Sequence, residues 1–247
     1  MEHGYVSEIF VSFQGEGAYA GEEHLFLRFA GCPLRCRYCD TPESLQRTRA
    51  CTLHSSLGQA TAELANPLRV EMLQALVCSV VERKPSVQRV AVTGGEPLVQ
   101  WRFLSQVLPG LAELRPVLLE TAGVHAEELT QVIEWVDVVS MDIKLPSNSG
   151  ERPRWQEHEA FLRAASRRQV YVKVLVDEGT DEAEVEQAAQ LVRRVAASTP
   201  VFLQPISSHE GELAVSAARL QRFFACARRH LETVRVMPQL HKLLGIP

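Results

Sequence analysis

The chain has 247 residues, of which 46% are hydrophobic, so it is long enough to bury one sizeable core, and we expect one domain over residues 1–247. Its formal net charge of -4, without any block of like charges, gives no electrostatic reason to expect a nucleic-acid partner. The sequence has neither an N-terminal apolar stretch of signal-peptide length nor a run long enough to span a bilayer. These features predict a cytoplasmic protein that binds neither nucleic acid nor a membrane.

Short runs of β-branched residues alternate along the chain with longer stretches of helical periodicity. The predicted strands are residues 25–29, 89–93, 117–120, 136–141, 170–176, 201–204 and 234–237. This strand and helix alternation predicts an α/β fold with a parallel sheet. Two segments break it: residues 42–67 are rich in Ser, Thr, Gln and Arg and are interpreted as an insertion or lid, whereas residues 146–154 are predicted to form a loop.

Three of the six cysteines, Cys32, Cys36 and Cys39, lie close together in the sequence. Disulfides are unfavourable in a reducing cytosol, so this group requires a metal or catalytic explanation. Three soft thiolates suit either zinc or an iron-sulfur cluster. A closed zinc site would need a fourth ligand, for which Cys51 and His54 are the nearest downstream candidates, so the spacing alone leaves both metals open.

Residues suited to catalysis or ligand binding follow the ends of the predicted strands. These groups are the three cysteines and residues 93–97, 120–121, 140–144, 204–205 and 239–242. The loops at the carboxyl ends of the strands build the active site of a parallel barrel. We therefore expect these groups to meet at one end of the sheet.

The C-x3-C-x2-C spacing, with Tyr38 directly before the last cysteine, resembles the radical S-adenosylmethionine (SAM) superfamily. Residues 8–17 and 26–31 are similar to the 7-carboxy-7-deazaguanine synthase (QueE) family of that superfamily. The likeness continues through residues 39–41, 93–97, 120–121, 144–147, 204–205 and 238–242. It covers most of the chain, with residues 42–67 as its clear departure. The resemblance implies a partial, incomplete (β/α) barrel of the radical SAM type.

The resemblance also implies the cofactors, the reaction and the partners. The cofactors are a 4Fe-4S cluster with one open iron, SAM and Mg2+; a deoxyadenosyl radical derived from SAM would take hydrogen from the substrate. The reaction converts 6-carboxy-5,6,7,8-tetrahydropterin to 7-carboxy-7-deazaguanine with loss of ammonia, within queuosine or other 7-deazapurine biosynthesis. The partners beyond this small-molecule substrate are a second copy of the chain in a homodimer and an external electron donor such as a flavodoxin or ferredoxin.

The family's functional positions carry over to matching residues of this sequence. The cluster ligands are Cys32, Cys36 and Cys39, and the Mg2+ ligand is Thr41. The SAM-binding residues are Tyr38, Cys39, Asp40, Gly95, Ser140, Asp142, Ile143, Lys144 and Gln204. The substrate-binding residues are Phe13, Gln14, Gly15, Glu16, Arg28, Thr93 and Pro247, the last through its terminal carboxylate.

Several of these assignments have alternatives. Relatives commonly show Ser-Pro-Lys where this chain has residues 142–144. Ser140, Asp142 and Lys144 alternate along the strand and could share one face, so any of them could carry the SAM contact. Arg28 points inward on a predicted strand and needs an anion, either a substrate carboxylate or a structural Asp or Glu. Thr41, followed by Pro42, either binds Mg2+ or merely ends the loop. Residues 241–242 are interpreted as packing or surface residues.

Two other functions remain open at this point. An activating enzyme that generates a glycyl radical on a partner protein would use the same cluster and barrel, but it would need an open docking face. A zinc-stabilised binding module would use the cysteines without catalysis.

Overall fold

The computed structural model describes residues 2–54, 59–208 and 211–246, and its main element is a ten-stranded sheet with the order β12-β11-β10-β9-β8-β7-β3-β2-β4-β5. The strands of this sheet are β2 (Val6–Phe13), β3 (Glu23–Phe29), β4 (Ala50–His54), β5 (Ala60–Ala65), β7 (Arg89–Gly94), β8 (Val117–Thr121), β9 (Val138–Ile143), β10 (Gln169–Val176), β11 (Val201–Pro205) and β12 (Val234–Val236). Two short strands, β1 (His3–Gly4) and β6 (Leu68–Arg69), pair with each other.

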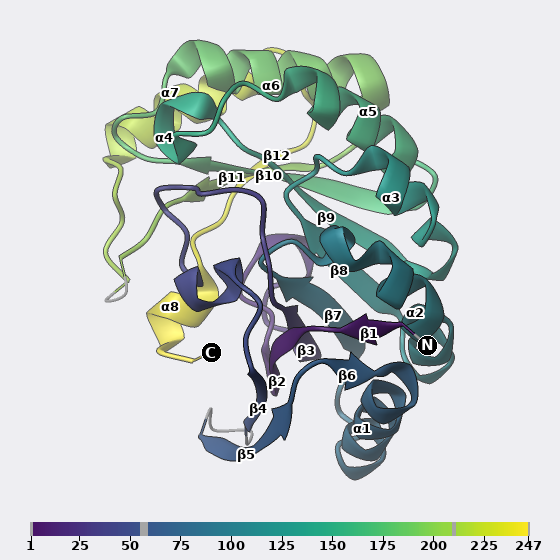
Figure 1. Ribbon diagram of the computed structural model, residues 1–247. Helices are drawn as coiled ribbons and strands as arrows, with labels where there is room; N and C mark the ends of the chain where they lie inside the picture. The colour runs from purple at the N-terminus through teal and green to yellow at the C-terminus, as the bar shows by residue number, and fades with distance from the viewer. Residues whose placement is uncertain (1, 55–58, 209–210, 247) are drawn as a thin grey trace.

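The sheet is parallel from β3 through β7 to β12. On the other side of β3, β2 is antiparallel to it, β4 is parallel to β2, and β5 is antiparallel to β4. Within the described residues, β12 and β5 are the two end strands and do not pair with each other, so the sheet forms an open arc (Figure 1). The expectation of an incomplete barrel is confirmed.

Helices cover the convex face of this arc. The α-helices are α1 (Val70–Arg83), α2 (Trp101–Leu114), α3 (Ala126–Thr130), α4 (Pro146–Ser149), α5 (Trp155–Ala165), α6 (Glu182–Ala196), α7 (Ala217–Arg228) and α8 (Leu240–Leu244). The 3-10 helices are η1 (Gly17–Tyr19), η2 (Pro42–Leu45), η3 (Pro97–Gln100) and η4 (Ile133–Trp135). In Figure 1, α1, α2, α3, α5, α6 and α7 lie outside the arc, whereas α8 lies at its open side.

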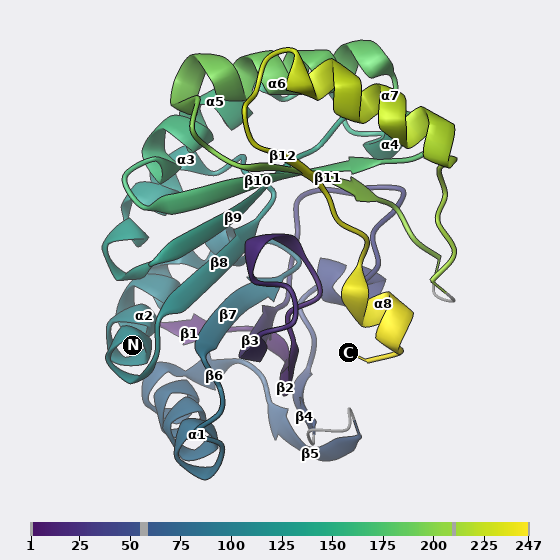
Figure 2. The same ribbon diagram turned by 180° about the vertical axis from the view of Figure 1, so that it is seen from behind.

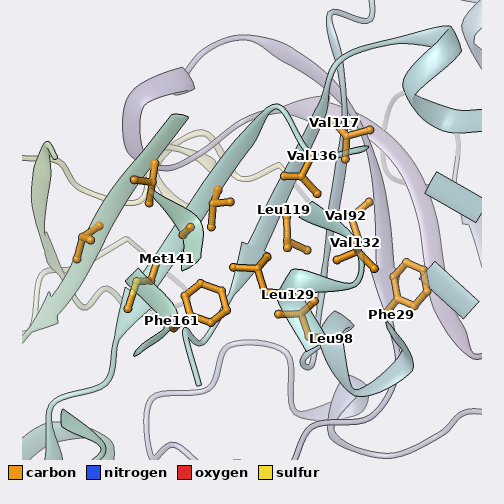
Figure 3. Close-up of a cluster of buried hydrophobic side chains, with 14 of the residues drawn as sticks. Phe29, Val92, Leu98, Val117, Leu119, Leu129, Val132, Val136, Met141 and Phe161 are labelled. Atoms are coloured by element: carbon orange, nitrogen blue, oxygen red, sulfur yellow. The ribbon is translucent and has the colours of Figure 1, made fainter. Parts of the chain in front are cut away.

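Strand alternation divides the buried side chains between two cores. On β3, Leu25 and Leu27 belong to the large core between sheet and helices, whereas Phe26 belongs to a smaller core on the concave face. Figure 3 shows part of the large core, where Val92 and Leu119 lie among helix and loop residues. Each fully buried aliphatic side chain of this kind contributes about 1.5–3 kcal/mol of transfer free energy.

The concave core fills the inside of the arc. Its members are Phe10, Phe26, Ala91, Leu118, Val138, Tyr171 and Phe202, with Tyr19 and Met237 packed against them. Tyr19 comes from the loop between β2 and β3, which lies inside the arc (Figure 2). We call this apolar layer the floor, and the candidate functional residues lie directly above it.

The seven strands predicted from the sequence are all present, although β9 starts at Val138, two residues later than predicted, after η4 ends at Trp135. The predicted loop at 146–154 is partly wrong, since α4 forms one helical turn that ends at Gly150 in the left-handed conformation. Residues 42–67 contribute η2 and the hairpin β4–β5, which continues the sheet beyond β2. The strand β2 was not predicted. Most of its residues are buried on both faces, so it lacks the alternation of a half-exposed strand.

Candidate active site

A polar layer lies directly above the apolar floor of the arc. Along each strand the residue two positions after a floor residue points to the same face. The polar side chains reached in this way are Arg28, Thr93, Glu120, Ser140, Lys173 and Gln204, and Glu8 occupies the equivalent position on the antiparallel β2. The expectation that the three cysteines and the residues after the strands meet at one end of the sheet is confirmed, because members of every such group line one cavity there.

A cavity of about 490 Å³ opens above this layer. The predicted site residues that line it are Phe13, Gln14, Gly15, Glu16, Arg28, Cys32, Cys36, Tyr38, Cys39, Asp40, Thr41, Thr93, Gly95, Asp142, Lys144 and Gln204. Two predicted residues lie elsewhere: Ser140 is buried in the layer below, and the Ile143 side chain packs into the large core on the opposite face. Pro247 lies outside the described residues.

The cysteine loop follows β3 and is held by backbone contacts to η2. Gly31 adopts a positive φ of 101°, its N–H donates to the Ser44 carbonyl at 2.7 Å, and Cys32 N–H donates to the Leu45 carbonyl at 3.2 Å. Burial raises the pKa of the Cys32 thiol to about 11 and also raises that of Cys36. These thiols are therefore protonated until a metal displaces the protons.

The distances between the three cysteine sulfurs argue against a preformed zinc site. Zn–S bonds of about 2.3 Å place two sulfurs on one zinc at most about 4.6 Å apart. Over the described ranges, one group of three His, Cys, Asp or Glu ligand atoms lies within 4.8 Å of one another, and it consists of Glu16, Asp40 and His241. The three cysteine sulfurs are not held that closely.

The glycines at the end of β7, Gly94 and Gly95, allow the backbone to approach the cysteine loop closely. Gly94 has a φ of 133°, and a side chain there would collide with the Phe29 backbone. A Cβ at Gly95 would lie 2.6 Å from the carbonyl oxygens of Gly31 and Ser44. Both positions therefore exclude any larger residue, and Gly95 presents bare backbone to the cavity that it lines.

A buried charge network forms one wall of the cavity. Lys173 pairs with Glu16 and, at 3.3 Å, with Asp142 Oδ1; Asp142 Oδ2 binds Lys144 Nζ at 2.7 Å. Burial raises the pKa of Glu16, but Lys173, His241 and Gln239 together lower it by more, so the pKa lies well below its usual range. Burial lowers the pKa of Lys173, but Asp142, Glu16, Glu120 and Tyr171 together raise it by more. Glu16 and Lys173 are consequently both ionised at neutral pH.

Glu120 connects two of the predicted substrate contacts. Its carboxylate accepts from Gln14 Nε2 at 2.8 Å and from Thr93 Oγ1 at 2.7 Å. Gln14 Oε1 in turn accepts from the Glu16 backbone N–H at 3.0 Å. The loop after β2 is thus fastened to β7 and β8, which fixes its polar atoms at the cavity wall.

His158 on α5 holds the end of β9 in place. Its Nδ1 donates to the Gly123 carbonyl at 2.9 Å, and its Nε2 accepts from the Lys144 backbone N–H at 3.2 Å. Burial lowers the pKa of His158 to about 4, so the imidazole is neutral near pH 7. The Lys144 ammonium then lies 5.4 Å from the centre of the Tyr38 ring.

The C-terminal helix α8 closes one side of the cavity. Gln239 Nε2 donates to Glu16 Oε1 at 2.9 Å and to Asp40 Oδ2 at 3.2 Å, while Leu240 N–H donates to the Gly15 carbonyl at 2.9 Å. The His241 ring packs directly on Gly15, where a side chain would collide with it. The interpretation of residues 241–242 as packing or surface residues was incomplete, because both line the cavity.

The cluster of Glu16, Asp40 and His241 has the proximity of a cation site, but its charges are already balanced. Glu16 holds Lys173, and Asp40 lies 3.7 Å from Lys242 Nζ. A divalent cation among these groups would meet two ammonium groups. We therefore do not assign a metal to this cluster.

Comparison with known proteins identifies the family. The model of the radical SAM superfamily matches residues 27–192. A 7-carboxy-7-deazaguanine synthase of Geobacter sulfurreducens is 37% identical over 242 residues, covering 97% of this chain and 96% of the relative. One of Methanopyrus kandleri is 35% identical over 243 residues, covering 97% and 92%. The chain belongs to the 7-carboxy-7-deazaguanine synthase family.

The fold agrees with this membership of the 7-carboxy-7-deazaguanine synthase family. The crystal structure of QueE from Escherichia coli matches with a TM-score of 0.61 and 21% identity, covering 97% of this chain and 95% of that one. A radical SAM methyltransferase from Sphaerobacter thermophilus matches with a TM-score of 0.57 and 13% identity, covering 94% and 77%. In the described part of the chain, no helix is long and apolar enough to cross a membrane.

Membership of the radical SAM superfamily implies a 4Fe-4S cluster and SAM, and the residues of this cavity fit both groups. Three cysteine thiols reach it from one loop, which suits a cluster with one iron left for SAM. Gln204 Oε1 is buried and accepts a hydrogen bond from none of the described residues. An acceptor in that state suits an amine donor of a ligand such as adenine.

Lys173 and Glu8 line the cavity but received no role in the sequence analysis. Lys173 stands in the apolar strand 169–176, and Glu8 stands in the similar run 6–13; a charged residue inside such a run was the available signal. Gln239 was expected among the groups at the strand ends, but its contacts could not be predicted, because they are made with the distant Glu16 and Asp40.

Proposed function

We propose that this chain converts 6-carboxy-5,6,7,8-tetrahydropterin to 7-carboxy-7-deazaguanine with loss of ammonia, a step of 7-deazapurine biosynthesis. The observation that carries the proposal is one cavity that joins a radical SAM cysteine loop to a layer of fixed hydrogen-bonding groups. Such paired donors and acceptors suit a planar, nitrogen-rich pterin. The names of the two full-length relatives support the same reaction.

In this proposal Cys32, Cys36 and Cys39 ligate the cluster. When bound, the cluster and SAM supply the radical that removes a hydrogen atom from the substrate. The SAM-facing residues are Tyr38, Asp40, Gly95, Asp142, Lys144 and Gln204. Burial lowers the pKa of Lys144, but Asp142, Tyr38 and Cys36 together raise it by more, so the ammonium persists and favours an anionic ligand group. Ser140 and Ile143, whose side chains do not line the cavity, would contribute through the position of β9.

The substrate would lie between the loop after β2 and the strand ends. Gln14, Gly15, Glu16 and Thr93 offer donors and acceptors to the ring, and Arg28 offers its guanidinium to the carboxylate. The Phe13 ring is 47% exposed at the cavity and would cover the pterin on binding. Gly245 and Ile246 line the cavity after α8, and Pro247, the further predicted substrate contact, lies outside the described residues.

Mg2+ would bind at Thr41, which lines the cavity at the start of η2. Magnesium commonly takes few protein oxygens and completes its octahedron with water and substrate oxygens. Thr41 lies on the same loop as the cysteines and Asp40 and would supply its hydroxyl oxygen to the metal.

The protein would act as a single radical SAM domain over residues 1–247 and would take electrons from a flavodoxin or ferredoxin. A homodimer would cover the open edges of the sheet, which end at β5 and β12. The activity of a glycyl-radical activating enzyme is less well supported, because α8 and the loop after β2 narrow the cavity that a protein substrate would have to enter.

The decisive experiment incubates anaerobically reconstituted protein with the carboxylated tetrahydropterin, SAM, reductant and Mg2+, and detects the deazaguanine by mass. We expect product that depends on all four components. Intact cluster and SAM cleavage without deazaguanine would refute the proposed reaction while leaving the superfamily assignment in place. Replacing Mg2+ with a chelator should lower the rate without changing the cluster absorption if Thr41 has the proposed role.

A further inference from the structure

The hairpin β4–β5 places a histidine behind the wall of the cavity. β4 pairs with β2 so that Glu8 lies opposite Thr52 and Ile9 lies opposite Leu53. His54 follows on the same face of β4 as Thr52, and its Nε2 lies 2.9 Å from Glu8 Oε2. Glu8 lines the cavity, whereas His54 stands behind it.

The same carboxylate also binds Arg28. Arg28 Nε donates to Glu8 Oε1, so the two oxygens of Glu8 are divided between Arg28 and His54. The Arg28 Cζ lies 5.3 Å from the centre of the Phe10 ring, and the His54 ring meets Phe10 edge-on at 6.2 Å with an interplanar angle of 85°. The three side chains are thereby fixed around one aromatic ring.

This arrangement affects how Arg28 meets a second anion. A guanidinium has five N–H donors, and Nε provides only one of them. A carboxylate paired with an arginine competes with any incoming carboxylate for the same positive charge. A second polar group beside Glu8 Oε2 withdraws part of that competition and fixes the carboxylate on the Nε side, which leaves the Nη groups of Arg28 for a bidentate ligand.

We propose that His54 is a positioning residue for carboxylate recognition, which makes the hairpin β4–β5 part of the specificity apparatus. His54 binds Glu8, Glu8 holds Arg28 through Nε, and Arg28 takes the substrate carboxylate. The inference rests on the proposed function, because it requires a carboxylated pterin as the ligand. It gives residues 42–67, the part of the chain that departs from the family resemblance, a role in choosing the substrate.

The test compares two stable pterins that differ in one charge. Pterin-6-carboxylate and pterin-6-carboxamide are titrated calorimetrically into the cluster-loaded, SAM-bound enzyme. We expect His54→Ala to weaken the carboxylate about tenfold and to change the carboxamide less than twofold. His54→Gln, whose amide can still donate to Glu8, should recover most of the carboxylate affinity.

The matched control is Thr61→Ala on the same hairpin, which removes a hydrogen bond from Thr61 Oγ1 to the Leu53 carbonyl. It should leave both affinities unchanged. In an E8Q background, His54→Ala should have no further effect on the carboxylate. Equal weakening of both pterins by His54→Ala, or no weakening of either, would overturn the inference. Failure of the unmodified enzyme to bind either pterin would instead count against the proposed function.

Discussion

Replacing Lys173 with methionine tests the buried charge network directly. The lysine is 4% exposed and pairs with Glu16 and Asp142, and methionine keeps much of its apolar stem while removing the charge. Removing one partner of a buried ion pair costs about 3–5 kcal/mol, because the remaining charge is left uncompensated. Asp142 retains Lys144, so most of this cost falls on Glu16.

The pH dependence of this loss has a definite sign. With Lys173 present, the pKa of Glu16 is held far below its usual value of 4.5, so its contribution to stability is present at neutral pH and is lost progressively as the pH falls below about 4.5. Without Lys173, burial raises that pKa, and the folded variant gains stability as protonation neutralises Glu16. The difference between the two proteins should therefore shrink from pH 7.5 to about pH 5.

Urea unfolding of the protein before cluster reconstitution, followed by circular dichroism, measures both effects. Lys84→Met is the matched control, since Lys84 Nζ binds Glu23 at 2.7 Å but the lysine side chain is 32% exposed. That change should cost less than about 1 kcal/mol at either pH. Equal costs for the two variants, or a Lys173→Met cost that does not depend on pH, would refute the reasoning.

Three further predictions follow from the site. Cys36→Ala should prevent cluster assembly, measured as iron per chain and brown colour, whereas Cys226→Ala, buried elsewhere, should leave both intact; equal iron contents would contradict the cluster assignment. Gly95→Ala would place a methyl group 2.6 Å from backbone oxygens and should weaken SAM binding in equilibrium dialysis more than tenfold, while Gly179→Ala, with 3.6 Å of clearance, should not. Because burial lowers the pKa of His158 to about 4, the unfolded chain takes up this proton first as the pH falls, so up to about 3 kcal/mol of stability should disappear between about pH 6.5 and 4; His158→Gln should remove that slope in urea unfolding.

The parallel part of the fold could be predicted because its strands are short apolar runs between periodic helices. The 169–176 and 201–205 strands are buried almost throughout, which leaves a clear apolar run in the sequence. The β4–β5 hairpin could not be recognised, because the strand at residues 60–65 is largely exposed at the sheet edge and carries few large apolar side chains. Its role depends on pairing with β2, which is a nonlocal contact.

The site was predictable wherever a motif is local. The cysteine loop and the glycines at the end of β7 are each a short continuous motif in the sequence. Both line the same cavity, as expected. The partner of Arg28 was left open between a substrate carboxylate and a structural acid, and the structure provides Glu8 in the latter role while keeping Arg28 at the cavity. Antiparallel pairing between β2 and β3 decides that contact, and no sequence spacing reports it.

Alternate side chains of each strand face either the large core or the ligand cavity. Selection for core packing and selection for ligand binding therefore act on different residues of the same strand. On β3, Leu27 serves the large core while its neighbour Arg28 serves the ligand, and on β7 Val92 and Thr93 divide the same tasks. A change of substrate can therefore arise by replacing ligand-facing residues one at a time while the large core keeps its composition. Lys173 marks the limit of that freedom, because its neighbours would have to change together with it. Drift into new activities should begin at uncharged positions such as Thr93 and reach the charge network last.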